Sequence, residues 1–176
     1  MPCIYALIPY YSKYLGVATT GILTGILLTH SSLATPLLLT SPNHEIILRQ
    51  FRLLQEKSGK PITHLAILSS AFYLTASYIR ATKSWPTTIR CWVAGFLTLG
   101  VIPYRYLVMR RTEKKLELLY QEEVEGMDFE VKGKEGEVVV KGEVRQLVDW
   151  WGVVNLGRVF GAGAAFLVGL STLKRR

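Results

Sequence analysis

The sequence has little charge for its length. Asp, Glu, Lys and Arg together make up 19% of the 176 residues, whereas 49% are hydrophobic. A typical soluble domain carries about 25% charged residues and disperses its apolar residues with helical or strand periodicity. Here the apolar residues lie instead in blocks of membrane-spanning length. The composition therefore argues against an ordinary soluble domain.

Cysteine, histidine and the common catalytic motifs are also scarce. Cys3 and Cys91 lack C-x-x-C spacing, so they indicate neither a disulfide framework nor a thiol redox motif, and we expect Cys3 to be an unmodified thiol rather than acylated. No GxGxxG, P-loop, GxSxG or HExxH motif occurs. The three histidines are scattered and lack clustered carboxylates, so we expect no metal site. These absences remove the commonest routes to nucleotide, serine and zinc chemistry.

The net charge of +8 has two readings. In a soluble protein it would favour nucleic-acid binding through phosphate contacts. In a membrane protein the same excess reflects Lys and Arg that flank the helices and contact anionic headgroups. Because the apolar blocks favour a membrane protein, we expect the lipid bilayer and not nucleic acid as the partner.

What the sequence does contain is four apolar stretches, each of about the length needed to cross roughly 30 Å of hydrocarbon. The predicted spans are about 14–34, 62–80, 91–109 and 151–173. The first has no charged residue and is longer than the apolar region of a cleavable signal peptide, so we expect a retained helix. Tyr10, Tyr11 and Tyr14 at its start are typical of an interfacial aromatic belt.

These spans predict an all-α fold, a single integral membrane four-helix bundle over residues 1–176. An extramembrane insert at about 110–149 separates the third and fourth helices. Its first part, 109–125, has the pattern of a charged amphipathic helix. The following segment, 127–144, predicts a solvent-exposed hairpin or a disordered loop. Four spans place both termini on one side, but the basic residues do not decide the orientation.

Proline and arginine mark two irregular places. Residues 36–60 contain apolar side chains at partly helical spacing, which predicts a short amphipathic helix on the membrane surface, ending before Pro61. Pro103 predicts a kink in the third span because it removes a backbone donor. Arg105 must either extend to the interface or face a polar cavity.

Small residues recur at every fourth position of the last span: Gly157, Gly161, Ala165 and Gly169. Such a stripe exposes the backbone and allows a neighbouring helix to approach closely. Gly21 and Gly25 provide one similar step in the first span. The pattern fits a compact bundle and also a homo-oligomer, and it gives no information about activity.

The best candidates for chemistry lie near the start of the last span. Trp151, Asn155 and Arg158 share one helix face at i, i+4 and i+7. A charged residue inside a span is costly unless it is paired or faces a cavity, although Arg158 could also extend to the interface. His30, near the end of the first span, could act as a general base because the ordinary histidine pKa is about 6.5. Its alternative role is a bond to a nearby carbonyl.

Two segments resemble the anthrone oxygenase family. They are PYRYLVMRRTEKKLELL, at 103–119, and VRQLVDWWGVVNLGRVFGAGAAFLVG, at 144–169. That family consists of four-span membrane proteins. Their third helix ends in a Pro-aromatic-Thr and Met-x-Pro-Thr-Asn-x-x-Leu pattern, and their last helix begins Trp-Gly-x-x-Asn-x-x-Arg. The residues that match are Pro103, Tyr104, Met109, Thr112, Leu116, Trp151, Gly152, Asn155 and Arg158.

Three positions depart from that pattern. Arg105 stands where the family usually has Thr, Arg111 where it has Pro, and Glu113 where it has Asn. These differences affect the expected reaction more than the expected fold.

The resemblance implies oxidation of an anthrone-like aromatic polyketide to a quinone, with molecular oxygen as co-substrate and no cofactor. It also implies a fungal aromatic polyketide pathway and an intracellular membrane such as the endoplasmic reticulum. On this reading His30 is the candidate base, and Arg158 and Asn155 stabilise the oxyanion.

Four further side chains are candidates for binding the substrate. Trp151 and Tyr104 would pack on the planar rings, and Arg105 and Thr112 complete the predicted substrate contacts. The alternative function is a non-catalytic bundle, such as a transport or assembly subunit, in which Arg158 and Asn155 join helices.

Overall fold

The computed structural model describes residues 2–41, 43–80, 85–124 and 143–173. Within these ranges the chain is almost entirely helical and has no strand. The elements are α1 (Pro2–Thr29), the π-helical segment η1 (His30–Ala34), α2 (Thr35–Leu39), α3 (His44–Arg80), α4 (Trp85–Tyr104), the π-helical segment η2 (Arg105–Met109), α5 (Arg110–Val124) and α6 (Glu143–Leu173).

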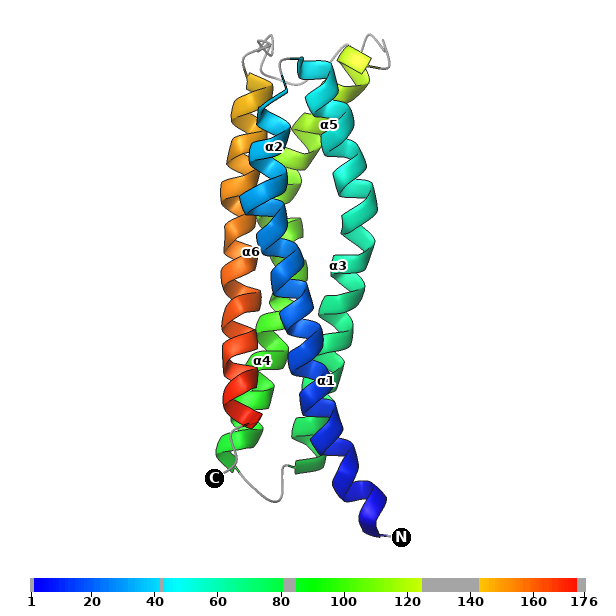
Figure 1. Ribbon diagram of the computed structural model, residues 1–176, viewed down its shortest axis with the longest axis vertical. Helices are drawn as coiled ribbons and strands as arrows, with labels where there is room; N and C mark the ends of the chain where they lie inside the picture. Colours follow the sequence, from blue (N-terminus) through cyan, green and yellow to red (C-terminus); the bar gives the residue numbers. More distant parts are fainter. Residues whose placement is uncertain (1, 42, 81–84, 125–142, 174–176) are drawn as a thin grey trace.

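These elements form four long rods that lie side by side (Figure 1). The first rod is α1, η1 and α2 in succession, the second is α3, the third is α4, η2 and α5, and the fourth is α6. Around the bundle, α1 packs on α3, α3 on α4, α4 on α6 and α6 on α1. The start of α1 and the end of α6 lie at the end of the bundle opposite to α2 and α5 (Figure 1), as expected for an even number of spans.

Each rod is long and apolar enough to cross a membrane. The candidate spans are Tyr10–Leu39, His44–Ile79, Trp85–Gln121 and Val144–Leu173. The four stretches predicted from the sequence fall on these four rods in the same order. The protein is therefore a multi-pass membrane protein with an all-helical four-helix architecture.

The prediction of a separate surface helix at 36–60 was wrong. Residues from His44 onward belong to α3, which continues through Pro61 to Arg80 without a break. The apolar face of this segment packs on α5 and α6, because Ile47, Leu48 and Phe51 are buried in one cluster with residues of those helices. An amphipathic pattern is the same whether its apolar face meets headgroups or two other helices, so the sequence alone does not distinguish them.

The segment that connects the third and fourth predicted spans is helical in its first part. The predicted charged extension is confirmed as α5, whose apolar side chains Leu116 and Leu119 are buried. The predicted hairpin or disordered loop falls largely on residues 125–142, which lie outside the described residues.

The bundle has a different core at each end. At the end that carries α2 and α5, large side chains fill the centre, among them Phe51, Met109 and Trp151. Further along, the buried cluster still contains Leu23, Leu27 and Ile62, but it has no buried aromatic residue and includes the small residues Ala66 and Ala162. The helices can approach more closely there, as expected where lipid supplies no hydrophobic drive between them.

Glycines take part in that close approach through tyrosine rings. The buried ring of Tyr73 on α3 lies against Gly16 of α1 and Gly169 of α6. A Cβ at residue 169 would lie 2.9 Å from Tyr73 Cζ, closer than real Cβ atoms approach other atoms. At Gly161 the situation differs, because a Cβ there would meet nothing within 4 Å. The glycine stripe of α6 thus accommodates a side chain at one level and borders open space at another.

Candidate active site

The predicted face of α6 points into the bundle. Asn155 is completely buried and Arg158 is 5% exposed. The alternative in which Arg158 extends to the interface therefore does not occur. A guanidinium at this depth is costly unless it has partners or borders a cavity, and the structure provides both.

Asn155 links the first rod to Arg158. Its amide Nδ2 donates to Ser31 Oγ at 2.8 Å and lies 3.4 Å from the carbonyl oxygen of Leu27. Its Oδ1 accepts a bond from Arg158 Nη1 at 3.2 Å. Both ends of the amide are thus engaged by protein groups, so Asn155 fixes the position of Arg158 relative to the first rod.

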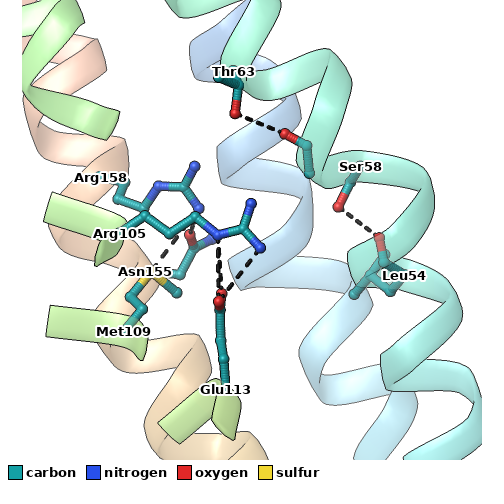
Figure 2. A network of polar contacts seen from close by, with 9 residues as sticks. Leu54, Ser58, Thr63, Arg105, Met109, Glu113, Asn155 and Arg158 are labelled. Atoms are coloured by element: carbon teal, nitrogen blue, oxygen red, sulfur yellow. Dashed lines mark hydrogen bonds and ion pairs between the residues drawn. The ribbon is translucent and has the colours of Figure 1, made fainter. Parts of the chain in front are cut away.

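Two π-helical segments supply partners for this pair. Ser31 belongs to η1, and Met109, whose Sδ lies 3.9 Å from Arg158 Nη1, is the last residue of η2 (Figure 2). Each segment has the wide hydrogen bond of a π turn, from Thr35 N–H to the His30 carbonyl and from Arg110 N–H to the Arg105 carbonyl. Such turns are rare and frequently occur at functional sites.

Proline accompanies both wide turns. Pro36 follows η1 and Pro103 precedes η2, in each case with one residue between them, and each lacks the backbone donor that a regular α-helix requires. The Thr35 hydroxyl gives the His30 carbonyl a second bond at 2.9 Å. The predicted irregularity at Pro103 thus coincides with a local change of helix type next to the site.

A cavity of about 460 Å³ lies between α4 and α6, and Arg158 forms part of its wall. The other lining groups are mostly apolar, including Val101, Gly161 and the ring of Tyr104. Within the described part of the chain, Arg158 Nε is buried and has no hydrogen-bond partner. A buried N–H without a partner is expensive, so this donor is a natural attachment point for a ligand atom.

Tyr104 joins the two walls of the cavity. Its hydroxyl donates to the carbonyl oxygen of Val154 on α6 at 3.1 Å. The ring can approach α6 so closely because residue 157 is glycine; a Cβ there would lie 2.8 Å from Tyr104 Cζ. Tyr104 is therefore held at the edge of the cavity next to Arg158.

Arg105 faces a second, smaller cavity on the side of α3. Its Nε lies 3.2 Å from Glu113 Oε1, and its Nη2 lies 3.4 Å from Glu113 Oε2 (Figure 2). This cavity, of about 240 Å³, also has polar and charged lining residues from α3 and α5, and the rest of its lining is apolar; the former are Arg52, Gln55, Glu56, Glu117 and Tyr120. Of the two alternatives for Arg105, the polar cavity is the one observed.

The other predicted residues occupy different positions. Trp151 is buried with its ring edge against Phe51, at 5.1 Å between ring centroids, and its Nε1 has no partner among the described residues. His30 is half-buried at the start of η1, within electrostatic range of Arg158. Thr112 is half-buried in α5. The larger cavity thus brings Arg158 and Tyr104 together, whereas Trp151, Arg105, His30 and Thr112 are not among its lining residues.

A family model for anthrone oxygenase matches residues 51–168, which is most of the chain. The chain belongs to the anthrone oxygenase family. No curated protein and no solved structure matches it significantly. Membership in the anthrone oxygenase family indicates an oxygenase, and the matched segment contains Tyr104, Met109, Asn155 and Arg158 but not Ser31.

Two of the three departures from the anthrone oxygenase pattern are charged residues that pair with each other. Arg105 and Glu113 replace uncharged residues, and they form an ion pair in which neither side chain is more than 26% exposed. Arg105 and Glu113 are both close enough to Arg158 to act on it electrostatically. Either residue without the other would therefore place an unpaired charge near Arg158. Arg111, the third departure, is exposed on α5.

Several site residues were not identified from the sequence. Ser31 was not singled out, Glu113 was noted only as a departure from the family pattern, and Gly157 and Gly161 were interpreted only as packing positions. The one usable signal was the joint occurrence of an extra Arg and an extra Glu eight residues apart. In the described ranges, no group of three or more His, Cys, Asp or Glu is arranged to hold a metal ion.

Proposed function

We propose that this protein oxidises an anthrone-like aromatic polyketide to a quinone with molecular oxygen, without a cofactor. The observation that carries the proposal is the buried Arg158 guanidinium, which borders an apolar cavity of about 460 Å³ and whose Nε has no partner in the described ranges. That volume is in the range of small-molecule sites. An apolar space with one cationic donor suits a planar ligand that develops negative charge on an oxygen.

The proposed reaction balances without an added reductant. A base removes one proton from the methylene carbon of the anthrone, and the resulting anion places its charge on the ring oxygen. The anion transfers an electron to oxygen, and the radical pair combines to form a carbon–oxygen bond. Loss of water from the hydroperoxide leaves the second carbonyl. One oxygen atom thus enters the product, and the other leaves as water with the two methylene hydrogens.

Each residue has a proposed role in this scheme. Arg158 donates to the developing oxyanion, and Asn155 is a positioning residue because its amide already bonds Ser31, Leu27 and Arg158. Tyr104 packs against the rings at the cavity edge. His30 is the proposed base.

Trp151, Arg105 and Thr112 do not line this cavity, and their proposed role is to complete the substrate environment around it. The co-substrate oxygen is apolar and can reach the site from the lipid. We propose an intracellular membrane such as the endoplasmic reticulum as the location.

The test is to supply the purified protein in lipid nanodiscs with anthrone under air and to record quinone absorbance and oxygen uptake. Wild-type protein should accelerate both above the spontaneous rate, with one oxygen consumed per quinone. Arg158→Ala should lower the rate by about 10²–10³-fold, the typical effect of removing an oxyanion donor. Arg49→Ala, at an exposed arginine of α3, is the matched control and should leave the rate unchanged. Equal rates with and without wild-type protein would exclude the proposal for this substrate.

A second candidate function is a non-catalytic bundle in which Asn155 and Arg158 join helices. The observation that favours it is that Asn155 makes all its bonds to protein groups on the first and fourth rods. On this reading Arg158→Ala would unfold the detergent-solubilised protein, and no variant would change oxygen uptake. On the first reading Arg158→Ala stays folded and loses only the reaction.

A further inference from the structure

The cavity beside Arg158 extends along α4 towards the lipid. Its lining runs from Val93 to Tyr104, which is about 16 Å along the helix axis at roughly 1.5 Å per residue. Val93, Phe96 and Leu97 line it and are also exposed on the surface of the bundle. Because they belong to a membrane span, that surface faces acyl chains. The cavity therefore has a polar inner end at Arg158 and an outer part that borders the bilayer.

Two glycines keep the space between α4 and α6 open. Gly100 on α4 and Gly161 on α6 both line the cavity, and a Cβ built at either position would meet nothing within 4 Å. Gly157 and Gly169, one turn and two turns away on the same helix, would instead place a Cβ against a tyrosine. Gly161 is therefore not needed for helix contact, and the open space beside it calls for another explanation.

We propose that Gly100 and Gly161 form a lateral entrance from the bilayer, through which a planar, lipid-soluble aromatic acid reaches Arg158. This inference rests on the proposed function for the identity of the ligand, and it adds the entry route and the residues that set the size of the ring system. The ligand is aromatic and acidic rather than an acyl chain, because the inner end of the cavity is lined by Arg158, whose Nε has no hydrogen-bond partner among the described residues.

Any side chain at residue 161 extends into the entrance. A leucine there has room in the empty protein, so the fold tolerates it, but it occupies the volume that the rings would use. Forcing a ligand past such a side chain is an overpacking problem, which typically weakens binding by about tenfold or more. Gly25 on α1 is the matched control, because a Cβ there also meets nothing within 4 Å and it lies outside the cavity.

The experiment compares wild type, Gly161→Leu and Gly25→Leu as full chains in lipid nanodiscs. The first measurement is the binding of 1-hydroxyanthraquinone, corrected for its uptake by protein-free nanodiscs. The second is anthrone oxidation under air. We expect Gly161→Leu to bind the probe about tenfold or more weakly and to turn over anthrone more slowly, with Gly25→Leu equal to wild type.

The outcomes separate the entrance from the reaction. If wild type binds the probe and Gly161→Leu does not, while no variant oxidises anthrone, the entrance stands and the proposed function fails. If wild type oxidises anthrone and Gly161→Leu matches Gly25→Leu in both measurements, the entrance is overturned and the proposed function stands. Probe binding no greater than that of protein-free nanodiscs overturns the entrance, whatever the turnover.

Discussion

Two positions of the glycine stripe on α6, Gly169 and Gly161, have different surroundings. We call them the closed level and the open level. At Gly169 the stripe is used for contact, since the ring of Tyr73 lies against the backbone of α6 and Val17 Cγ2 would be 3.1 Å from an added Cβ. At Gly161, two turns earlier, the same spacing borders a cavity. The helix is continuous through both levels. The difference lies in what the neighbouring helices present, which is a tyrosine at one level and Gly100 at the other.

The polar centre lies next to the open level. Asn155 and Arg158 are within two turns of Gly161, and their partners come from the two π-helical segments. At the closed level, packing of the Tyr73 ring is accompanied by one buried hydrogen bond from Lys13 Nζ of α1 to the Thr172 carbonyl oxygen of α6. At the open level, the side-chain amide of Asn155 and the guanidinium of Arg158 make the hydrogen bonds across the bundle. The comparison predicts that substitutions at the two levels fail in different ways.

The largest effect on stability is expected for Asn155→Ala at the polar centre. The change removes two donors and the acceptor of Arg158 Nη1, and it leaves a buried cation with fewer partners. We expect a loss of about 2–3 kcal/mol in the free energy of unfolding, because one of the bonds involves a charged donor. Denaturant titration of the detergent-solubilised protein measures it. Ser171→Ala, at an exposed hydroxyl of the same helix, should change stability by less than about 0.5 kcal/mol.

The next effect is expected at the closed level. Gly169→Ala places a methyl group against the Tyr73 ring and should cost about 1–2 kcal/mol through overpacking. The second change Tyr73→Phe removes the nearest atom and should recover part of that loss. Equal stability of Gly169→Ala and wild type would show that the closed level is looser than its contacts indicate.

A smaller loss, of about 1 kcal/mol, is expected for Gly157→Ala. Its Cβ meets Tyr104, but this ring is half-buried at the cavity edge and can turn into the open space. The movement should break the bond to the Val154 carbonyl and narrow the cavity. Unfolding and binding of 1-hydroxyanthraquinone should therefore both change. If Gly157→Ala loses stability but binds the probe as tightly as wild type, the Tyr104 ring does not turn into the cavity.

The smallest expected effect is an increase in stability rather than a loss. Gly161→Ala should raise the free energy of unfolding by up to about 0.5–1 kcal/mol, since alanine favours the helix and a Cβ meets nothing there. Together with Gly169→Ala it forms a matched pair, the same substitution in the same stripe with opposite outcomes. Destabilisation by both substitutions would mean that Gly161 is also a contact position.

The sequence was sufficient for the architecture and for the face of α6 that carries the polar pair. Long uncharged stretches define spans because unpaired backbone groups are excluded from hydrocarbon, and helical spacing places Asn155 and Arg158 together. It was insufficient for residues 44–60, since an amphipathic pattern does not say what covers its apolar face. It also could not separate Gly161 from Gly169, because that difference depends on side chains of α3 and α4.

The ion-pair partner of Arg105 also could not be predicted from the sequence. Glu113 lies eight residues away, a spacing that separates two residues by about 12 Å along a regular helix. The intervening segment contains the π turn of η2. Propensities do not reveal a local change of helix type, although the proline nearby marked the place.

The bond between Asn155 and Ser31 bears on how the protein could be shortened. The family match begins at Phe51, so the serine that receives the amide lies upstream of the recognised region. A fragment trimmed to the recognised region would leave the Asn155 amide N–H groups without their acceptors inside a membrane-spanning helix. The first rod lies outside the matched segment, yet it supplies both acceptors of the Asn155 amide N–H groups inside that segment.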